Sequence, residues 1–211
     1  MFKKLFNPDN ALMITMNQMT DCIFLSLFWL LCSFPLVTLG PSSAALYDAV
    51  YHAFRTGDKH SWGRFLSSFR RNLKSGILPG LVYLAVFCLT AWGLIQVWNA
   101  AATLKISMGL FSAAAFGAVV VLGILSVMFP MLSRFENSFA GLLRNTVLLA
   151  LVNLPRTVAL GALYAVSIAL CVRFIFPLFF MPALAGLLST WLLEPMFKPY
   201  MPKEEPAGEE Q

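Results

Sequence analysis

Charged residues are scarce in this chain. Asp, Glu, Lys and Arg make up 12% of its 211 residues, whereas a soluble globular domain has about 25%. Hydrophobic residues make up 59%, against about 45–50% in a soluble domain. The apolar runs are continuous rather than alternating, which favours helices over strands. The sequence therefore predicts an all-α, polytopic membrane protein, with one domain over residues 1–200 and a disordered polar tail over 201–211.

Residues that build chemical sites are also scarce. The chain has two histidines, His52 and His60, and no third ligand lies at a spacing suited to a metal. Its four cysteines lie in apolar runs without a Cys-x-x-Cys motif, which indicates small buried hydrophobic residues: Cys22, Cys32, Cys88 and Cys171. No Ser/His/Asp arrangement, Walker loop or dinucleotide fingerprint is present. We therefore expect no enzyme activity, no catalytic residue, and neither metal nor cofactor.

Positive charge is in excess, with a net charge of +5. In a soluble protein this would suggest nucleic acid, but here the basic residues fall between apolar runs and indicate membrane topology. Eleven of the 15 lysines and arginines lie in the segments 36–76, 131–156 and 195–211. We therefore predict that these segments face the inside of the cell, with the N-terminus outside and the C-terminus inside, and that no nucleic acid binds.

Five apolar segments are predicted to span the membrane. The clearest is 77–98, whose 22 residues are uninterrupted by charge and, at about 1.5 Å per residue, cross a hydrocarbon core of about 30 Å. The stretch 157–193 carries a single charge, Arg173, and its two prolines predict a break into two short spans. The predicted spans are about 14–35, 77–98, 106–129, 157–174 and 178–194.

Two amphipathic segments, 41–75 and 134–153, separate these spans. Within the first, we predict one helix over 41–56 and another over 62–75, which Gly76 ends. The second of these helices combines an aromatic stripe with a basic face, which is typical of a helix lying in the membrane interface. We predict that both segments lie on the cytoplasmic side. The pattern leaves open whether 134–156 is interfacial or part of the fourth span.

The stretch 34–45 joins the first span to the first amphipathic segment. Pro35 and Gly40-Pro41 favour an interruption of the helix, and Pro41 suits the first turn of a new one. We predict that the chain leaves the membrane here and turns along its surface. Phe129-Pro130 repeats the ending Phe34-Pro35, which suggests a parallel internal repeat.

A polar stripe lies in the predicted first span. Asn17, Gln18 and Asp21 share one helical face, and a carboxylate is costly in lipid. An ionisable residue inside a membrane is a functional candidate. The alternative is that the stripe joins helices to one another or lies among lipid headgroups.

A second candidate site is a lipid-headgroup or partner surface. The predicted helix beginning at Pro41 would direct free N–H groups of its first turn towards the interface, where an anion can bind. Basic side chains follow in the same segment, and the candidate surface consists of Ser42, Ser43, Arg64, Arg70, Arg71 and Lys74. The alternative is a plain helix cap accompanied by topology-setting charges.

Part of the chain resembles a known family. The segments Trp29-Leu30, Phe34-Pro35-Leu36-Val37-Thr38-Leu39-Gly40-Pro41 and Ala44-Ala45-Leu46-Tyr47 are similar to the signature of the YesL family, as is Phe65-(x)3-Phe69-Arg70-Arg71-Asn72. The resemblance extends over about residues 5–197 and is most specific at 29–76. It implies a bacterial inner (plasma) membrane protein of unestablished biochemical function. Members often occur beside sugar-uptake transporters and polysaccharide-degrading enzymes, so it also implies a link to carbohydrate use, but no catalytic residues.

Three functions remain as hypotheses. The first is a non-enzymatic accessory protein that partners a transporter or another membrane protein. The second is a small-solute transporter that uses the stripe at Asp21, most plausibly as a homo-oligomer. The third is a lipid-binding membrane sensor that acts through 41–75. Membrane lipid is an expected partner in all three.

Overall fold

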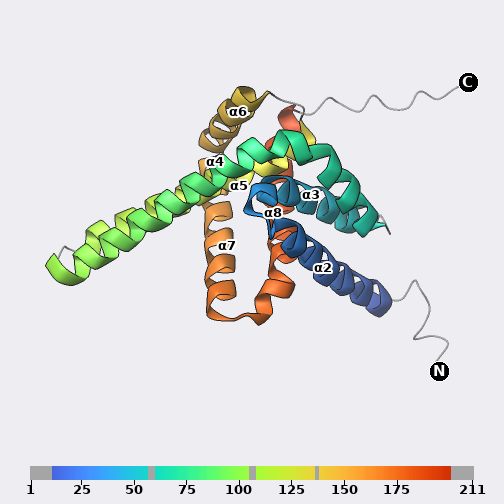
Figure 1. The fold of residues 1–211 in the computed structure, drawn as a ribbon, viewed down its shortest axis with the longest axis horizontal. Helices are drawn as coiled ribbons and strands as arrows, with labels where there is room; N and C mark the ends of the chain where they lie inside the picture. The colour runs from blue at the N-terminus through green and yellow to red at the C-terminus, as the bar shows by residue number, and fades with distance from the viewer. Residues whose placement is uncertain (1–10, 57–59, 105–107, 136–137, 201–211) are drawn as a thin grey trace, which may run out of the picture.

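The computed structural model describes residues 11–56, 60–104, 108–135 and 138–200, and these ranges contain helices and no strand. The predicted all-α class is therefore confirmed (Figure 1). The helices are α2 (Ala11–Ser33), α3 (Leu39–Tyr51), α4 (Ser61–Leu104), α5 (Met108–Arg134), α6 (Phe139–Val152), α7 (Leu154–Arg173) and α8 (Met181–Phe197). Short 3-10 turns cover Leu36–Thr38, Phe176–Phe179 and Lys198–Tyr200, and a π-helical turn covers His52–Thr56. The predicted tail 201–211 lies outside the described residues.

Among the described residues, three helices are long and apolar enough to cross a membrane, judged by length and composition. They are Ser61–Ala101, Gly109–Arg134 and Leu154–Arg173, which overlap the predicted spans 77–98, 106–129 and 157–174. The first and fifth predicted spans correspond to α2 and to α8, which has 17 residues. The several long apolar helices support a multi-pass membrane protein, while the total of five spans stays a prediction.

Helix α4 corrects the expected boundary at Gly76. It is a single helix of 44 residues with Pro79 inside it, so the predicted helix 62–75 and the predicted span 77–98 are continuous. A Cβ atom added at Gly40 of α3 would lie 2.9 Å from the Cα of Gly80 and would collide with the carbonyl oxygen of Gly76. Gly76 and Gly80 therefore allow α4 to pack closely against α3 at Gly40. Figure 1 shows α4 bending as it passes this region.

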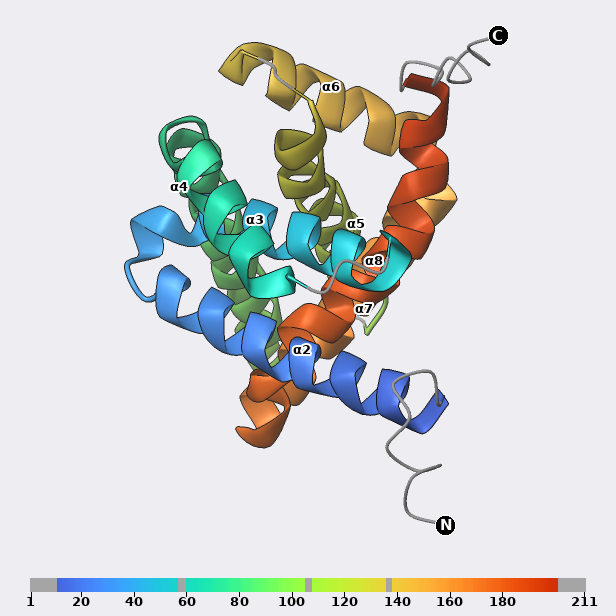
Figure 2. The same cartoon turned by 90° about the vertical axis from the view of Figure 1, so that its right-hand side faces the viewer.

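Helix α3 is the centre of the bundle, which corrects the prediction of a surface helix over 41–56. Ten of its 13 residues are buried. They pack against α2, α4, α5 and α8 in two apolar clusters, one around Tyr47 and Leu193 and the other around Val50 and Phe65. Figure 2 shows α3 running between α4 and α8. The turn after Pro35 thus sends the chain into the protein interior, because α3 is rich in small side chains that let neighbouring helices approach.

Helix α2 lies beside α3 and the first turns of α4. The rings of Phe28 and Phe65 are 6.0 Å apart, and Leu25 is buried in the same cluster. The predicted separation of a span at 14–35 from a surface segment at 41–75 is therefore not seen, because the two form one core.

Helices α5 and α7 approach closely through small residues. A Cβ atom added at Gly161 would lie 3.0 Å from the backbone nitrogen of Gly123, and one added at Gly123 would lie 3.0 Å from the Thr157 side chain. The other part of α5 follows α4 away from the bundle, and Figure 1 shows these two helices projecting together. Large apolar side chains such as Trp92 and Phe116 are exposed on this projection.

Helix α5 also corrects the predicted repeat. Pro130 lies inside α5, which continues to Arg134, whereas α2 ends before Phe34. Phe129 is buried, with its ring 4.8 Å from that of Tyr83. The two Phe-Pro pairs are therefore not equivalent, because Pro130 is held within a packed helix.

Helix α6 settles how the segment 134–156 is divided. The Ser138 hydroxyl accepts a hydrogen bond from the Gly141 N–H and caps α6, which ends at Val152. Helix α7 then begins at Leu154 with Pro155 in its first turn. Figure 2 shows α6 crossing over the bundle as a separate helix, so it is not the start of the fourth span. Its place at a membrane interface stays a prediction.

Candidate functional site

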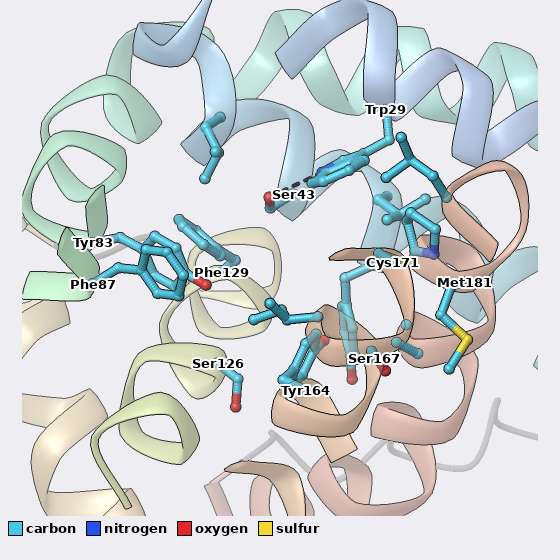
Figure 3. Close-up of a pocket in the computed structure, with 18 of the residues that line it drawn as sticks. Trp29, Ser43, Tyr83, Phe87, Ser126, Phe129, Tyr164, Ser167, Cys171 and Met181 are labelled. Atoms are coloured by element: carbon cyan, nitrogen blue, oxygen red, sulfur yellow. Dashed lines mark hydrogen bonds between the residues drawn. The ribbon is translucent and has the colours of Figure 1, made fainter. Parts of the chain in front are cut away.

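An apolar cavity of about 310 Å³ lies beside α3. Its lining comes from α2, α3, α4, α5, α7 and α8 and from the turn Phe176–Phe179. Figure 3 shows aromatic side chains around it, and they include Trp29, Tyr83, Phe87, Phe129 and Tyr164. The Trp29 indole N–H donates to the Ser43 hydroxyl at 3.1 Å, which fixes the ring at the cavity wall.

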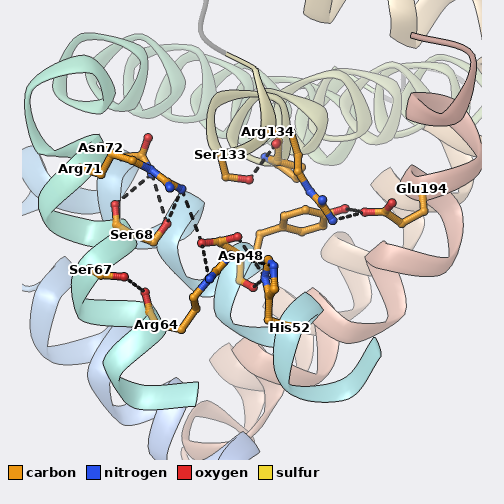
Figure 4. A network of polar contacts seen from close by, with 12 residues as sticks. Asp48, His52, Arg64, Ser67, Ser68, Arg71, Asn72, Ser133, Arg134 and Glu194 are labelled. Carbon is orange, nitrogen blue, oxygen red and sulfur yellow. Dashed lines mark hydrogen bonds and ion pairs between the residues drawn. The ribbon is translucent and has the colours of Figure 1, made fainter. Parts of the chain in front are cut away.

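A polar network lies at the ends of several helices (Figure 4). Its first centre is Asp48, whose side chain is 4% exposed. The Asp48 carboxylate is 3.5 Å from Nε of Arg64 and 3.6 Å from Nη2 of Arg71. Its Oδ2 atom is buried without a hydrogen bond among the described residues. Two arginines of α4 therefore neutralise the charge of Asp48 at a distance longer than a good hydrogen bond.

His52 completes this centre from the next turn of the chain. Its Nε2 atom is 2.7 Å from Nη2 of Arg64, and its Nδ1 atom is 2.8 Å from the backbone oxygen of Asp48. Arginine is only a donor, so Nε2 must accept and Nδ1 must carry the hydrogen. The His52 ring therefore joins Asp48 to Arg64.

The second centre is Glu194, near the end of α8. Its Oε1 atom accepts hydrogen bonds from the Tyr47 hydroxyl at 2.8 Å and from Nη2 of Arg134 at 2.7 Å. The Arg134 and Glu194 side chains are each 18% exposed, so this is a largely buried ion pair. Burial raises the pKa of the Tyr47 phenol, and the neighbouring Glu194 carboxylate raises it further, so Tyr47 remains a donor.

Helix α3 joins the two centres through its helical spacing. Tyr47 and Tyr51 are four residues apart and face Arg134, whose guanidinium carbon is 3.7 Å from the centre of the Tyr51 ring. Asp48 and His52, also four residues apart, face α4. The network thus gathers parts of 36–76 and 131–156, together with Glu194 of α8, at one end of the bundle. Which side of a membrane this end faces stays a prediction.

The predicted polar stripe is only partly described. Asp21 accepts a hydrogen bond from the Ser61 hydroxyl at 2.9 Å, so it links α2 to the first residue of α4. Asn17 and Gln18 lie in α2, but their side chains lie outside what the structure describes. The contact to Ser61 supports the interpretation of Asp21 as a link between helices.

The predicted headgroup surface is divided by the fold. Ser42 is fully buried and its hydroxyl is 2.6 Å from that of Ser33, while Ser43 accepts from Trp29. Neither serine lies on an open helix end, because α3 begins at Leu39 and is packed against α4. Arg64 and Arg71 converge on Asp48. The remaining members, Arg70 and Lys74, are exposed.

Sequence reasoning missed Tyr47, Asp48, Arg134 and Glu194 as members of one site. The four-residue spacing of Asp48 and His52 was a visible signal for a local pair. The contact between Tyr47 and Glu194 spans 147 residues, and no local pattern indicates such a pairing.

Comparison with known proteins gives one match. Residues 22–94 match the model of a family described as a protein of unknown function, DUF624. This is the family to which YesL proteins belong, although the match does not name YesL. No match was found among curated proteins or among solved structures. Over the second half of α2, α3 and most of α4, which include Asp48, Arg64 and Arg71, the chain is therefore similar to the DUF624 family.

Proposed function

We propose that this chain is a non-enzymatic accessory membrane protein that works by binding another membrane protein. The observation that supports the proposal most strongly is that its described acidic side chains join helices to one another. The described ranges contain three acidic residues, and each of them links two or more helices: Asp21, Asp48 and Glu194. Such groups support a fixed scaffold more than they support chemistry or proton movement.

The same contacts weigh against the transporter hypothesis. Asp21, the residue expected to take part in transport, is held by Ser61. A carbohydrate needs many hydrogen-bonding groups in its site, whereas the cavity beside α3 is lined mainly by apolar side chains. A role in carbohydrate uptake or utilisation, as the family resemblance implies, would therefore act through a partner. We propose a component of a sugar-uptake system as that partner.

Site-specific photocrosslinking in the native membrane tests the proposal. A photoreactive phenylalanine analogue replaces Trp92 on the projection of α4 and α5, or Arg70 at the polar end. Both residues are exposed. We expect at least one of these positions to form a discrete adduct with a transport protein, identified by mass spectrometry. The same analogue at Phe65, which is 0% exposed, is the control and should give no such adduct.

Co-purification provides the second measurement. The tagged full chain is isolated in mild detergent and in lipid nanodiscs, before and after crosslinking. A transport component should be recovered with the chain and should be lost when the crosslinked position is changed to alanine. Recovery of the chain alone in both media, with no protein adduct at either position, would contradict the proposal.

A further inference from the structure

Several hydroxyl groups around the cavity beside α3 already donate hydrogen bonds within the protein. Ser126 donates to the backbone oxygen of Gly123 at 2.8 Å, and Ser167 donates to that of Leu163 at 2.8 Å. Tyr47 donates to Glu194. Because these three donors are already hydrogen-bonded, they do not require a hydrogen-bond acceptor on a ligand. The cavity surface that a ligand would contact is predominantly apolar.

The mouth of the cavity lies next to an exposed part of α7. Val172 lines the cavity and is 82% exposed, whereas Ala185 and Phe129 line it and are buried. Val172 belongs to Leu154–Arg173, one of the helices apolar enough to cross a membrane. Val172 is the last residue but one of this helix, beside Arg173, so the mouth opens towards lipid near one end of the helix when it crosses a bilayer. The cavity extends inward from there to Tyr47 of the central helix.

From this geometry we infer that the cavity is a binding site for a linear hydrocarbon chain, which enters beside Val172 and ends near Tyr47. The volume of about 310 Å³ falls in the range of about 300–1,000 Å³ found for small-molecule sites. An apolar cavity of this kind excludes water, because water would find too few hydrogen-bonding partners in it. The chain belongs to a bilayer phospholipid or to a free fatty acid, two sources of one chemistry.

Trp29 provides a direct probe of occupancy because its ring forms part of the wall. In a full-length variant with Trp62, Trp92, Trp98 and Trp191 changed to Phe, Trp29 is the only indole. This protein is placed in nanodiscs in which either the phospholipid acyl chains are brominated or a brominated fatty acid is added. Bromine quenches indole fluorescence on contact, so we expect quenching of Trp29 in at least one arm, and the arm identifies the source of the chain.

Two obstructing substitutions decide between binding in the cavity and ordinary contact with lipid. Cys171→Phe and Leu178→Phe enlarge side chains that line the cavity, and each should reduce the quenching of Trp29. Cys88→Phe is the matched control, because Cys88 is exposed on α4 and outside the lining, and it should leave quenching unchanged. Leu178→Phe also provides a second route if Cys171→Phe does not fold.

Native mass spectrometry of the unsubstituted chain gives an independent readout. Lipid or fatty acid should remain bound after detergent exchange, and Cys171→Phe should lose one such molecule while Cys88→Phe retains it. Equal quenching in the obstructed and control proteins in both arms, together with equal lipid retention, would overturn the inference. A failure of the partner experiments would leave this result unaffected, because neither measurement requires a partner protein.

Discussion

Tyr47 and Glu194 lie 147 residues apart in the chain and are joined by a hydrogen bond of 2.8 Å. Glu194 also pairs with Arg134, so one carboxylate connects the ends of α5 and α8 to the middle of α3. Tyr47 also lines the apolar cavity. The central helix therefore contacts both the candidate binding site and the buried ion pair.

The first prediction concerns this ion pair. Glu194→Gln keeps the shape of the side chain but leaves the Arg134 guanidinium without its counter-charge. Removing one partner of a buried pair costs about 3–5 kcal/mol, and the residual exposure of this pair places the expected loss at the lower end. Tyr47→Phe removes one hydrogen bond and should cost less, about 1.5–3 kcal/mol. Thermal unfolding of both variants in the same detergent compares their losses of stability. A larger loss of stability for Tyr47→Phe than for Glu194→Gln would contradict the prediction.

The second prediction compares two carboxylates. Asp48→Asn removes the charge that holds Arg64 and Arg71 together, so the apparent melting temperature should fall. Asp21→Asn should have a small effect, because an amide oxygen can still accept from Ser61.

A double-substitution cycle checks the role of Asp48. Arg64→Gln combined with Asp48→Asn should destabilise less than the sum of the two single changes, because the uncompensated charge is partly removed. Additive losses would show that the two side chains are not coupled. For Asp21→Asn, loss of solute uptake in a correctly folded protein would favour the transport hypothesis instead.

The third prediction concerns the contact between α3 and α4. Gly40→Ala places a Cβ atom 2.9 Å from the Cα of Gly80, and both atoms belong to packed helices that must separate. The variant should be strongly destabilised or should fail to fold. Gly117→Ala is the matched control, because no atom lies within 4 Å of its added Cβ. Alanine favours a helix over glycine by about 1 kcal/mol, so this control should melt at the same or a higher temperature. Equal melting temperatures for the two variants would contradict the close approach of α3 and α4.

The fourth prediction concerns orientation. The polar network gathers the first turns of α4 and the ends of α5 and α8 at one end of the bundle, and basic residues on this end predict that it faces the cytoplasm. A fluorescent protein fused after residue 211 should therefore fluoresce, and alkaline phosphatase fused there should be inactive. The reverse result would place the network on the outer side.

Local patterns in the sequence account for much of the fold. The all-α class follows from continuous apolar runs, and the end of α2 follows from Pro35, which cannot donate a helical hydrogen bond. Close packing of α5 was visible in its small residues. Gly76, in contrast, was expected to end a helix, and this prediction was wrong because its missing side chain serves the contact with α3. Propensity describes an isolated helix, and packing overrides it.

The candidate site shows the same division between local and distant information. Burial of Asp48 could not be predicted from its own segment, because α3 has the composition of an amphipathic helix and its partners come from α4. By itself, the sequence determined where helices form, where Pro35 interrupts them and which segments are basic. Only the tertiary structure decided that α3 is central, that Asp48 and Glu194 meet arginines, and that a cavity remains beside Tyr47. Periodicity acts over a few residues, whereas these contacts depend on how helices distant in sequence pack together.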